Sequence, residues 1–241
     1  MSGHSKWATT RRQKETTDKK RSASFTRLAR AVTIAVKEGG SDASSNFKLR
    51  MAIEKAKQGN MPKDNIERAI KRGTGELEGE TIEEINYEAI GPENIALIIK
   101  VLTDNKNRTV SEIKNILSKS GGKLAGSNSV SWMFDLKGVI RINDAKSQIK
   151  NLEEFQLNLI ESGAEDFIEQ GQNLEIHTQI NSLAKIKETA ETQNIKFDSP
   201  EIEYISKKEN QIQIQDKEKI EKLLDALEEN EDIEEIYTNI K

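Results

Sequence analysis

Cysteine does not occur among the 241 residues, so disulfides, thiolate catalysis and cysteine-ligated metal sites are all excluded. The chain also lacks any run of about 18 apolar residues, and no membrane-spanning helix is expected. Its first residues have none of the apolar character of a secretory signal. Together these absences predict a cytoplasmic protein that does not act in a membrane.

Signals of enzymatic chemistry are equally scarce. The sequence contains no nucleophile elbow, no Walker motif and no dinucleotide-binding fingerprint. Its two histidines, His4 and His177, fall in regions predicted to belong to different domains, and neither has the spacing of a metal site. The acidic stretch LEENEDIEE at residues 227–235 is most simply interpreted as a solvated helix end and turn. We therefore predict a protein that is not an enzyme and needs no cofactor or metal.

What the sequence does contain is an uneven distribution of charge. The chain has 37 Lys and Arg and 41 Asp and Glu, which gives a formal net charge of −4 at pH 7. Residues 1–72 nevertheless carry 18 of the cations and only 7 of the acids. One end of the chain can therefore attract a polyanion that the remainder repels. The alternative is that these basic helices only present a solvated face.

Apolar residues at helical spacing predict three short helices after a basic arm of residues 1–21. The first helix is expected to begin at Ser22 or Ser24, either of which can act as its N-cap. The second spans about residues 45–58, and the third ends at Gly73. Three short amphipathic helices with apolar faces predict a small helical domain.

The pattern changes to that of strands after the glycine-rich stretch GTGELEGE at residues 73–80. Alternation at residues 85–89 and the β-branched run IALIIKVL at 95–102 predict two strands. A helix with Thr109 as its N-cap follows, and a strand over residues 130–134 comes next. The order of this segment is β-β-α-β.

Residues 138–205 fit a complete β-α-β-β-α-β unit, which is the order of the ferredoxin-like motif. The tail adds a helix at about 216–229 and a strand at 233–239, which would complete the preceding β-β-α-β segment as a second such sandwich. The predicted fold is therefore α+β, with an N-terminal three-helix domain followed by two ferredoxin-like α/β sandwich domains, the middle one discontinuous. The expected parts are a basic arm at 1–21, a helical domain at 22–76, a discontinuous α+β domain at 77–136 plus 207–241, and an inserted ferredoxin-like domain at 137–206.

The arm has the composition of a phosphate-binding segment. Lys and Arg at this density neutralise phosphates and gain affinity through the release of counterions. Trp7 could stack on a base or dock back onto the helical domain, and the sequence supports both alternatives equally. The predicted nucleic-acid contacts of the arm and the first helix are His4, Lys6, Trp7, Arg11, Arg12, Lys14, Lys19, Lys20, Arg21, Arg27 and Arg30.

Two further stretches are candidates for contacts. In GNMPKDNIERAIKRG, Met61 precedes Pro62 at the tip of a turn, where it would be an adaptable apolar contact or a staple onto Ile66. The polar loop TDNKNRT leaves the end of a buried strand, and caps or Asx turns explain its Asp and Asn residues equally well. Such turns leave Arg108 unexplained. The candidate residues of both stretches are Met61, Lys63, Arg68, Lys71, Arg72, Asn105, Lys106, Asn107 and Arg108.

Five stretches, in order and at consistent spacing, resemble the YebC/PmpR family. They are GHSKW at 3–7, NMPKDNIERAIKRG at 60–73, LTDNKNRT at 102–109, GGKLAGSNSVSWMF at 121–134 and LLDALEENEDIEEIYTN at 223–239. The resemblance covers nearly the whole chain and implies three domains, the first of them helical. Bacterial members of that family are described as probable transcriptional regulators, and mitochondrial relatives as translational activators of cytochrome oxidase.

These observations together predict a nucleic-acid-binding regulator of gene expression. The first interpretation is a transcriptional regulator that binds DNA. The alternatives are a ribosome-associated translation factor that contacts ribosomal RNA and tRNA, and a protein-interaction module whose basic arm binds an acidic partner. The sequence has no recognisable helix-turn-helix recognition helix and no obvious dimer seam, and a monomer is favoured.

Overall fold

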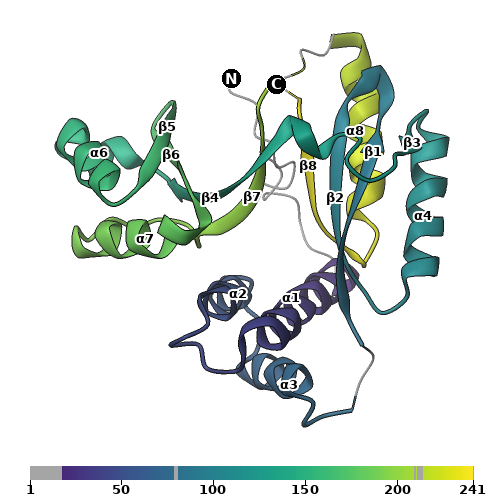
Figure 1. Ribbon diagram of the computed structural model, residues 1–241, viewed down its shortest axis with the longest axis horizontal. Helices are drawn as coiled ribbons and strands as arrows, with labels where there is room; N and C mark the ends of the chain where they lie inside the picture. Colours follow the sequence, from purple (N-terminus) through teal and green to yellow (C-terminus); the bar gives the residue numbers. More distant parts are fainter. Residues whose placement is uncertain (1–17, 79–80, 209, 211–213, 241) are drawn as a thin grey trace. The chain divides into compact units, whose positions relative to one another are not determined.

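The computed structural model describes residues 18–78, 81–208, 210 and 214–240, apart from the side chains of residues 18–22, 214 and 215 (Figure 1). The chain divides into two compact units. One comprises the described parts of Gly3–Phe134 and Ser206–Lys241, and the other comprises Asp135–Ile205. The domain boundaries predicted from the sequence, with an inserted domain at 137–206, stay a proposal beside this division. None of the described helices is long and apolar enough to cross a membrane.

Three helices open the first of these units: α1 Asp18–Gly39, α2 Phe47–Gln58 and α3 Lys63–Thr74. Their apolar faces meet in one core, in which Val32, Leu49 and Ala69 are almost fully buried. Asn46 caps α2 by accepting a hydrogen bond from the backbone N–H of Leu49 at 3.0 Å. Its side-chain amide also donates to the carbonyl of Ala35 at 2.7 Å, which ties the start of α2 to α1.

Two of the limits predicted for these three helices are wrong. α1 already includes Asp18, which precedes the earliest predicted start, because the Lys and Arg residues that follow it are good helix formers. α3 continues through Gly73, and Gly75, with a φ of +80°, provides the left-handed residue after its end. A Cβ at Gly73 would lie 2.5 Å from the Cβ of Val36 on α1. This glycine therefore permits the close approach of two helices and does not end one.

A four-stranded antiparallel sheet follows in the same unit, with the strand order β3-β1-β2-β8. The strands of this sheet and the helices between them are β1 Glu83–Ile90, η2 Pro92–Asn94, β2 Ala96–Thr103, α4 Lys106–Lys119, β3 Lys123–Leu124, α8 Ile214–Glu228 and β8 Ile233–Thr238. β2 is buried along almost its whole length, as predicted, and its Leu97 and Ile99 share one core with Ile113 of α4 and Leu223 of α8. The tail of the chain thus completes the sheet, which is therefore built from two segments that are far apart in the sequence.

The strand predicted over residues 130–134 is not formed. Ser131–Met133 form a 3-10 turn, η3, and Phe134 is the first residue of β4 Phe134–Ile142, which belongs to the other sheet. The third sequential strand of the first sheet is the two-residue β3. The carboxylate of Glu88 on β1 accepts hydrogen bonds from the backbone N–H groups of Asn128 and Val130 at 2.7 and 2.6 Å. Because a side chain uses these donors, they are not available to a neighbouring strand.

The unit Asp135–Ile205 contains a second four-stranded sheet, with the order β5-β6-β4-β7. Its elements are β4 Phe134–Ile142, α5 Ala145–Gln148, α6 Leu152–Glu161, β5 Ala164–Gln170, β6 Asn173–Thr178, η4 Ile180–Ser182, α7 Leu183–Thr192 and β7 Glu201–Ser206. The first strand, β4, lies between the third and the fourth, as in a ferredoxin-like sandwich. Ile140 of β4, Phe155 of α6 and Ile186 of α7 are almost fully buried. The predicted α+β fold is confirmed.

Candidate nucleic-acid interface

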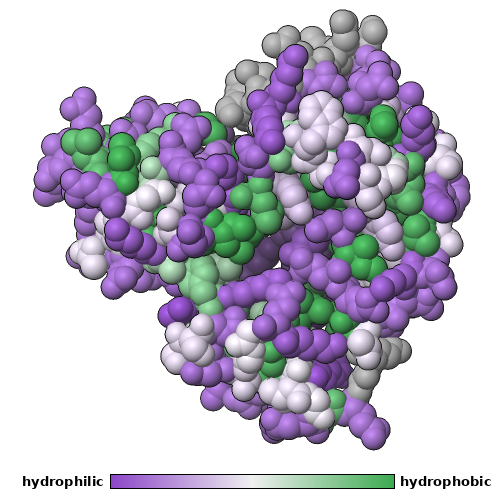
Figure 2. Space-filling view, in the orientation of Figure 1, coloured by the Kyte–Doolittle hydropathy of each residue, from purple (hydrophilic) through white to green (hydrophobic). Residues whose placement is uncertain are grey.

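The exposed face of α3 carries three cations. Lys71 and Arg72 follow Arg68 by three and four positions, which makes each of them a neighbour of Arg68 on the helix surface. All three are exposed, and none of them makes an ion pair with any residue that the structure describes. Lys63, at the start of the helix, is also exposed and pairs with Glu67 at 3.5 Å. On the face shown in Figure 2, hydrophilic residues cover most of the three-helix part.

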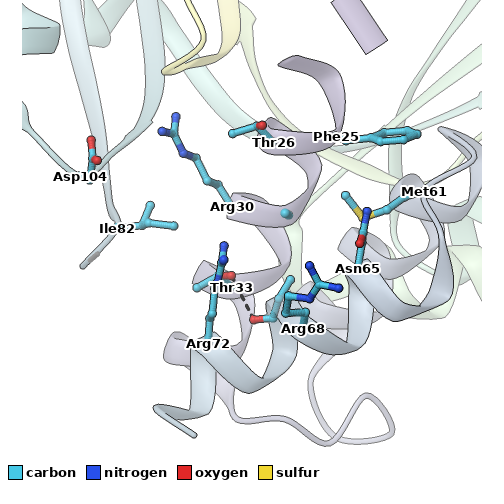
Figure 3. A pocket seen from close by; sticks show the side chains of 12 residues that line it. Phe25, Thr26, Arg30, Thr33, Met61, Asn65, Arg68, Arg72, Ile82 and Asp104 are labelled. Atoms are coloured by element: carbon cyan, nitrogen blue, oxygen red, sulfur yellow. Dashed lines mark hydrogen bonds between the residues drawn. The ribbon is translucent and has the colours of Figure 1, made fainter. Parts of the chain in front are cut away.

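A pocket of about 570 Å³ lies between α1 and α3, beside the residue that follows β2 (Figure 3). Its side chains combine cationic Arg30, Arg68 and Arg72 with apolar Phe25 and Met61 and with the amide of Asn65. The acid that lines it is Asp104. The volume falls in the range of small-molecule sites, and its cations favour an anion.

Arg30 is engaged in a way that the cations of α3 are not. Its guanidinium donates to the carboxylate of Asp232 at 2.7 Å and to the carbonyl of Leu102 at 3.1 Å. Arg27, one turn earlier on α1, donates to the carbonyl of Ile233 at 3.4 Å. Both arginines are predicted from the sequence as nucleic-acid contacts. In the structure they join α1 to the start of β8.

Asp232 receives hydrogen bonds from several elements. It is 4% exposed and accepts from Arg30, from Arg108 at 2.8 Å, and from the hydroxyls of Thr109 and Thr103 at 2.6 and 3.1 Å. Burial alone would raise the pKa of this carboxyl. The hydrogen bonds from Arg108, Thr109 and Arg30 outweigh that effect and hold the pKa of Asp232 below its ordinary value.

The loop between β2 and α4 is held by its own side chains. Asn105 caps α4 by accepting a hydrogen bond from the backbone N–H of Arg108 at 3.0 Å, so the helix begins at Lys106 and not after the predicted N-cap, Thr109. Arg108 also donates to Asp104 at 2.7 Å. The hydrogen bonds that Arg108 donates to Asp232 and to Asp104 raise the pKa of Arg108, whose side chain is still 43% exposed.

Lys106 and Asn107 lie on the first turn of α4 and are exposed. Lys106 pairs with Glu83 at 2.5 Å, and both side chains of this pair remain about half exposed. The first turn of α4 therefore presents these two residues to solvent. Asn105 and Arg108 are instead engaged within the turn, which fits the alternative that caps and turns explain this stretch.

The prediction that residues 227–235 form a solvated acidic helix end and turn is wrong at two positions. Asp232 and Glu235 are both buried. Lys55 of α2 pairs with Glu235 at 2.7 Å, and Arg30 of α1 pairs with Asp232. The partners lie 180 and 202 positions away in the sequence, so no local pattern distinguishes these two carboxylates from their solvated neighbours.

Met61 does not stand exposed at the tip of its turn. Its side chain is 6% exposed and belongs to the core of the three helices, although it also lines the pocket. A contact between Met61 and nucleic acid stays a prediction. Sequence reasoning missed Asn65, which lines the same pocket. Asn65 precedes Arg68 by three positions and Arg72 by seven, so helical spacing was the signal that could have identified it.

The remaining predicted contacts lie where the structure gives no side chains. His4, Lys6, Trp7, Arg11, Arg12 and Lys14 fall outside the described residues, and Lys19, Lys20 and Arg21 belong to α1 without described side chains. All nine stay predictions from the sequence.

His177 is a buried residue of β6 in the unit Asp135–Ile205. Its Nε2 lies 2.7 Å from the carboxylate of Glu175, which also accepts a hydrogen bond from Arg141 at 2.7 Å. Two hydrogen bonds from Arg141 to Glu203, at 2.6 and 3.0 Å, extend this network. Among the described residues, no group of three or more histidine and acidic residues is placed to hold a metal ion.

Comparisons with known proteins agree with this architecture. Residues 5–76 match a family model described as the TACO1/YebC protein N-terminal domain, and residues 82–240 match the TACO1/YebC second and third domain. The crystal structure of a conserved hypothetical protein, Aq1575, from Aquifex aeolicus superposes with a TM-score of 0.85 at 37% identity. The match covers 98% of this chain and 96% of that one.

Curated relatives match the chain over its whole length. A protein from Pseudothermotoga lettingae is 46% identical over 241 residues, which cover 100% of this chain and 94% of the relative. A protein from Fervidobacterium nodosum is 47% identical over 239 residues, with coverage of 99% and 93%. Both carry the name "Probable transcriptional regulatory protein". The predicted resemblance is thereby confirmed, and the chain belongs to the TACO1/YebC family.

Proposed function

We propose that this chain is a cytoplasmic regulator of gene expression that acts by binding nucleic acid and not by catalysis. The observation that carries the proposal is the basic face of α3, where Arg68, Lys71 and Arg72 are exposed and have no ion-pair partner among the described residues. A guanidinium can bind a phosphate through two parallel hydrogen bonds. Because these cations break no ion pair on binding, their full charge is available to a polyanion.

Regulation of transcription through DNA is the first form of this proposal. The relatives are named as probable transcriptional regulatory proteins, and they match this chain over nearly its whole length. The basic arm of residues 1–21 would add further phosphate contacts, because seven of its residues are Lys or Arg.

One feature of α3 favours the second candidate, a ribosome-associated factor that contacts structured RNA. In a helix-turn-helix, residues at the N-terminal end of the second helix contact base edges in the major groove. The corresponding end of α3 exposes the carboxylates of Asp64 and Glu67, which DNA phosphates would repel. Lys63 at this end is paired with Glu67, and the cations without an ion-pair partner among the described residues, Arg68, Lys71 and Arg72, lie in the second half of the helix. This distribution fits phosphates on the outside of a folded RNA better than insertion of the helix into a groove.

Crosslinking in cells, followed by identification of the bound molecules, tests the proposal and separates its forms. Promoter DNA would support transcriptional regulation, and ribosomal RNA or tRNA would support the translation alternative. The variant R68E/R72E should lose the crosslinked nucleic acid. The control K114E/K119E, which reverses two exposed charges on α4, should keep it. Recovery of acidic proteins without nucleic acid would contradict the proposal and support the protein-interaction alternative.

A further inference from the structure

The pocket between α1 and α3 brings together two kinds of chemistry that a plain phosphate-binding surface does not need. Arg68 and Arg72 supply exposed positive charge, whereas Phe25 and Met61 supply apolar surface beside it. The amide of Asn65 adds a group that can both donate and accept hydrogen bonds. Figure 3 shows Asn65, Arg68 and Met61 grouped on one side of the pocket, with Arg72 further along α3.

We propose that this pocket binds one unpaired nucleotide of an RNA or DNA strand. The base would lie against Phe25 and Met61, Asn65 would meet a base edge, and Arg68 or Arg72 would hold an adjacent phosphate. This inference rests on the proposed function, because it names the part of a nucleic acid that the same surface recognises. Unpaired bases commonly stack on aromatic side chains, and their phosphates are held by nearby cations.

The burial of Met61 favours an unpaired nucleotide over a duplex as the ligand of the pocket. Its side chain is 6% exposed and lies within the pocket, so only a group that enters the pocket can touch it. In a duplex the bases are stacked inside the helix, and the outer surface offers phosphates and sugars. A duplex could therefore pair with Arg68 and Arg72 but leave the apolar part of the pocket unused. A base that is already unpaired enters at the smallest unstacking cost.

The far wall of the pocket is fixed by contacts that do not depend on a ligand. Arg30 is anchored on Asp232 at 2.7 Å, and Asp104 is paired with Arg108 at 2.7 Å. Thr33 of α1 donates to the carbonyl of Ala69 of α3 at 3.0 Å, which holds the two helices together across the base of the pocket (Figure 3). The cavity is thus formed before binding, and binding need not order it.

The test compares a short blunt hairpin with the same hairpin extended by a few unpaired nucleotides, in RNA and in DNA. We expect the full-length protein to bind the extended hairpin on the order of tenfold more tightly in at least one of the two chemistries. Whether the preference appears with RNA or with DNA identifies the kind of strand that the pocket binds. No preference in either arm, with salt-dependent binding of the blunt hairpin intact, would overturn the inference and leave the proposed function standing. No salt-dependent binding of any probe would contradict both.

Two substitutions assign the preference to the pocket. N65F fills the pocket without changing charge and should abolish the preference. N115F places the same side chain on the exposed surface of α4 and should leave the preference intact. F25L keeps an apolar side chain in the core, removes the aromatic face and should reduce the preference. A preference that survives both N65F and F25L, in protein shown to be folded by circular dichroism, would place the unpaired nucleotide elsewhere and overturn the proposal.

Discussion

Arg30 of α1 and Asp232, in the turn before β8, are joined at 2.7 Å although 202 positions separate them in the sequence. Lys55 of α2 and Glu235 of β8 form a second such pair at 2.7 Å. Both pairs connect the three helices to the sheet that the tail of the chain completes. We infer that the helices and this sheet are stabilised together, because a buried carboxylate requires its cations.

Loss of the charge at Asp232 should destabilise the protein. D232N keeps the shape of the side chain but leaves Arg30 and Arg108 without their shared carboxylate. Because Asp232 is 4% exposed whereas Arg108 is 43% exposed, we expect a loss of about 1–3 kcal/mol in the free energy of unfolding, less than for a fully buried pair. Urea denaturation measures this loss. The control E188Q, at an exposed position of α7, should change stability by less than about 0.5 kcal/mol.

The same carboxylate should make stability depend on pH. The pKa of Asp232 is lowered in the folded state, whereas an aspartate in an unfolded chain has a pKa of about 3.9. Its contribution is therefore present above about pH 4 and is lost as the pH falls through the lower pKa of the folded state. We expect the difference in unfolding free energy between the unmodified protein and D232N to shrink on acidification below about pH 4. A difference that stays constant down to about pH 2 would contradict this assignment.

The elements that could be predicted from the sequence are those whose signals are local. The buried run of β2 and the apolar stripes of α1 and α4 need no knowledge of the rest of the chain. The strand wrongly expected over residues 130–134 does not form because Glu88, some forty positions earlier, accepts hydrogen bonds from three backbone N–H groups in or beside that stretch. At the candidate site, the cations of α3 were predictable from helical spacing. The hydrogen bonds of Arg30 and Arg108 to Asp232 could not be predicted in this way, because those contacts connect distant parts of the chain.

Gly73 should be intolerant of even one added methyl group. A Cβ there would lie 2.5 Å from the Cβ of Val36 and 2.9 Å from the carbonyl oxygen of Thr33. We expect G73A to cost about 1–3 kcal/mol through overpacking, although alanine is the better helix former. Part of that cost should be recovered in G73A/V36G, which removes the Cβ of residue 36, measured as a favourable coupling in a double-mutant cycle. Additive losses would argue against this contact as the cause.

Glu88 should hold the loop that carries Trp132. Its carboxylate accepts from Asn128, Val130 and Ser131, while the exposed indole of Trp132 donates to the carbonyl of Ser129 at 3.0 Å. In E88Q one acceptor oxygen becomes an amide donor, and we expect a loss of about 1 kcal/mol and a more mobile loop. The fluorescence anisotropy of Trp132, measured in a W7F background, should fall. Unchanged anisotropy would show that other contacts fix the loop.

The central claim is that α3 binds the phosphates of a nucleic acid through Arg68 and Arg72, and the salt dependence of binding tests it most directly. Each phosphate contact to duplex DNA contributes about 0.9 to the slope of log affinity against log salt. R68A/R72A should therefore weaken binding and flatten that slope by about 1.8. K114A/K119A removes the same charge from α4 and should leave the slope unchanged. A slope in R68A/R72A equal to that of the unmodified protein would contradict the account.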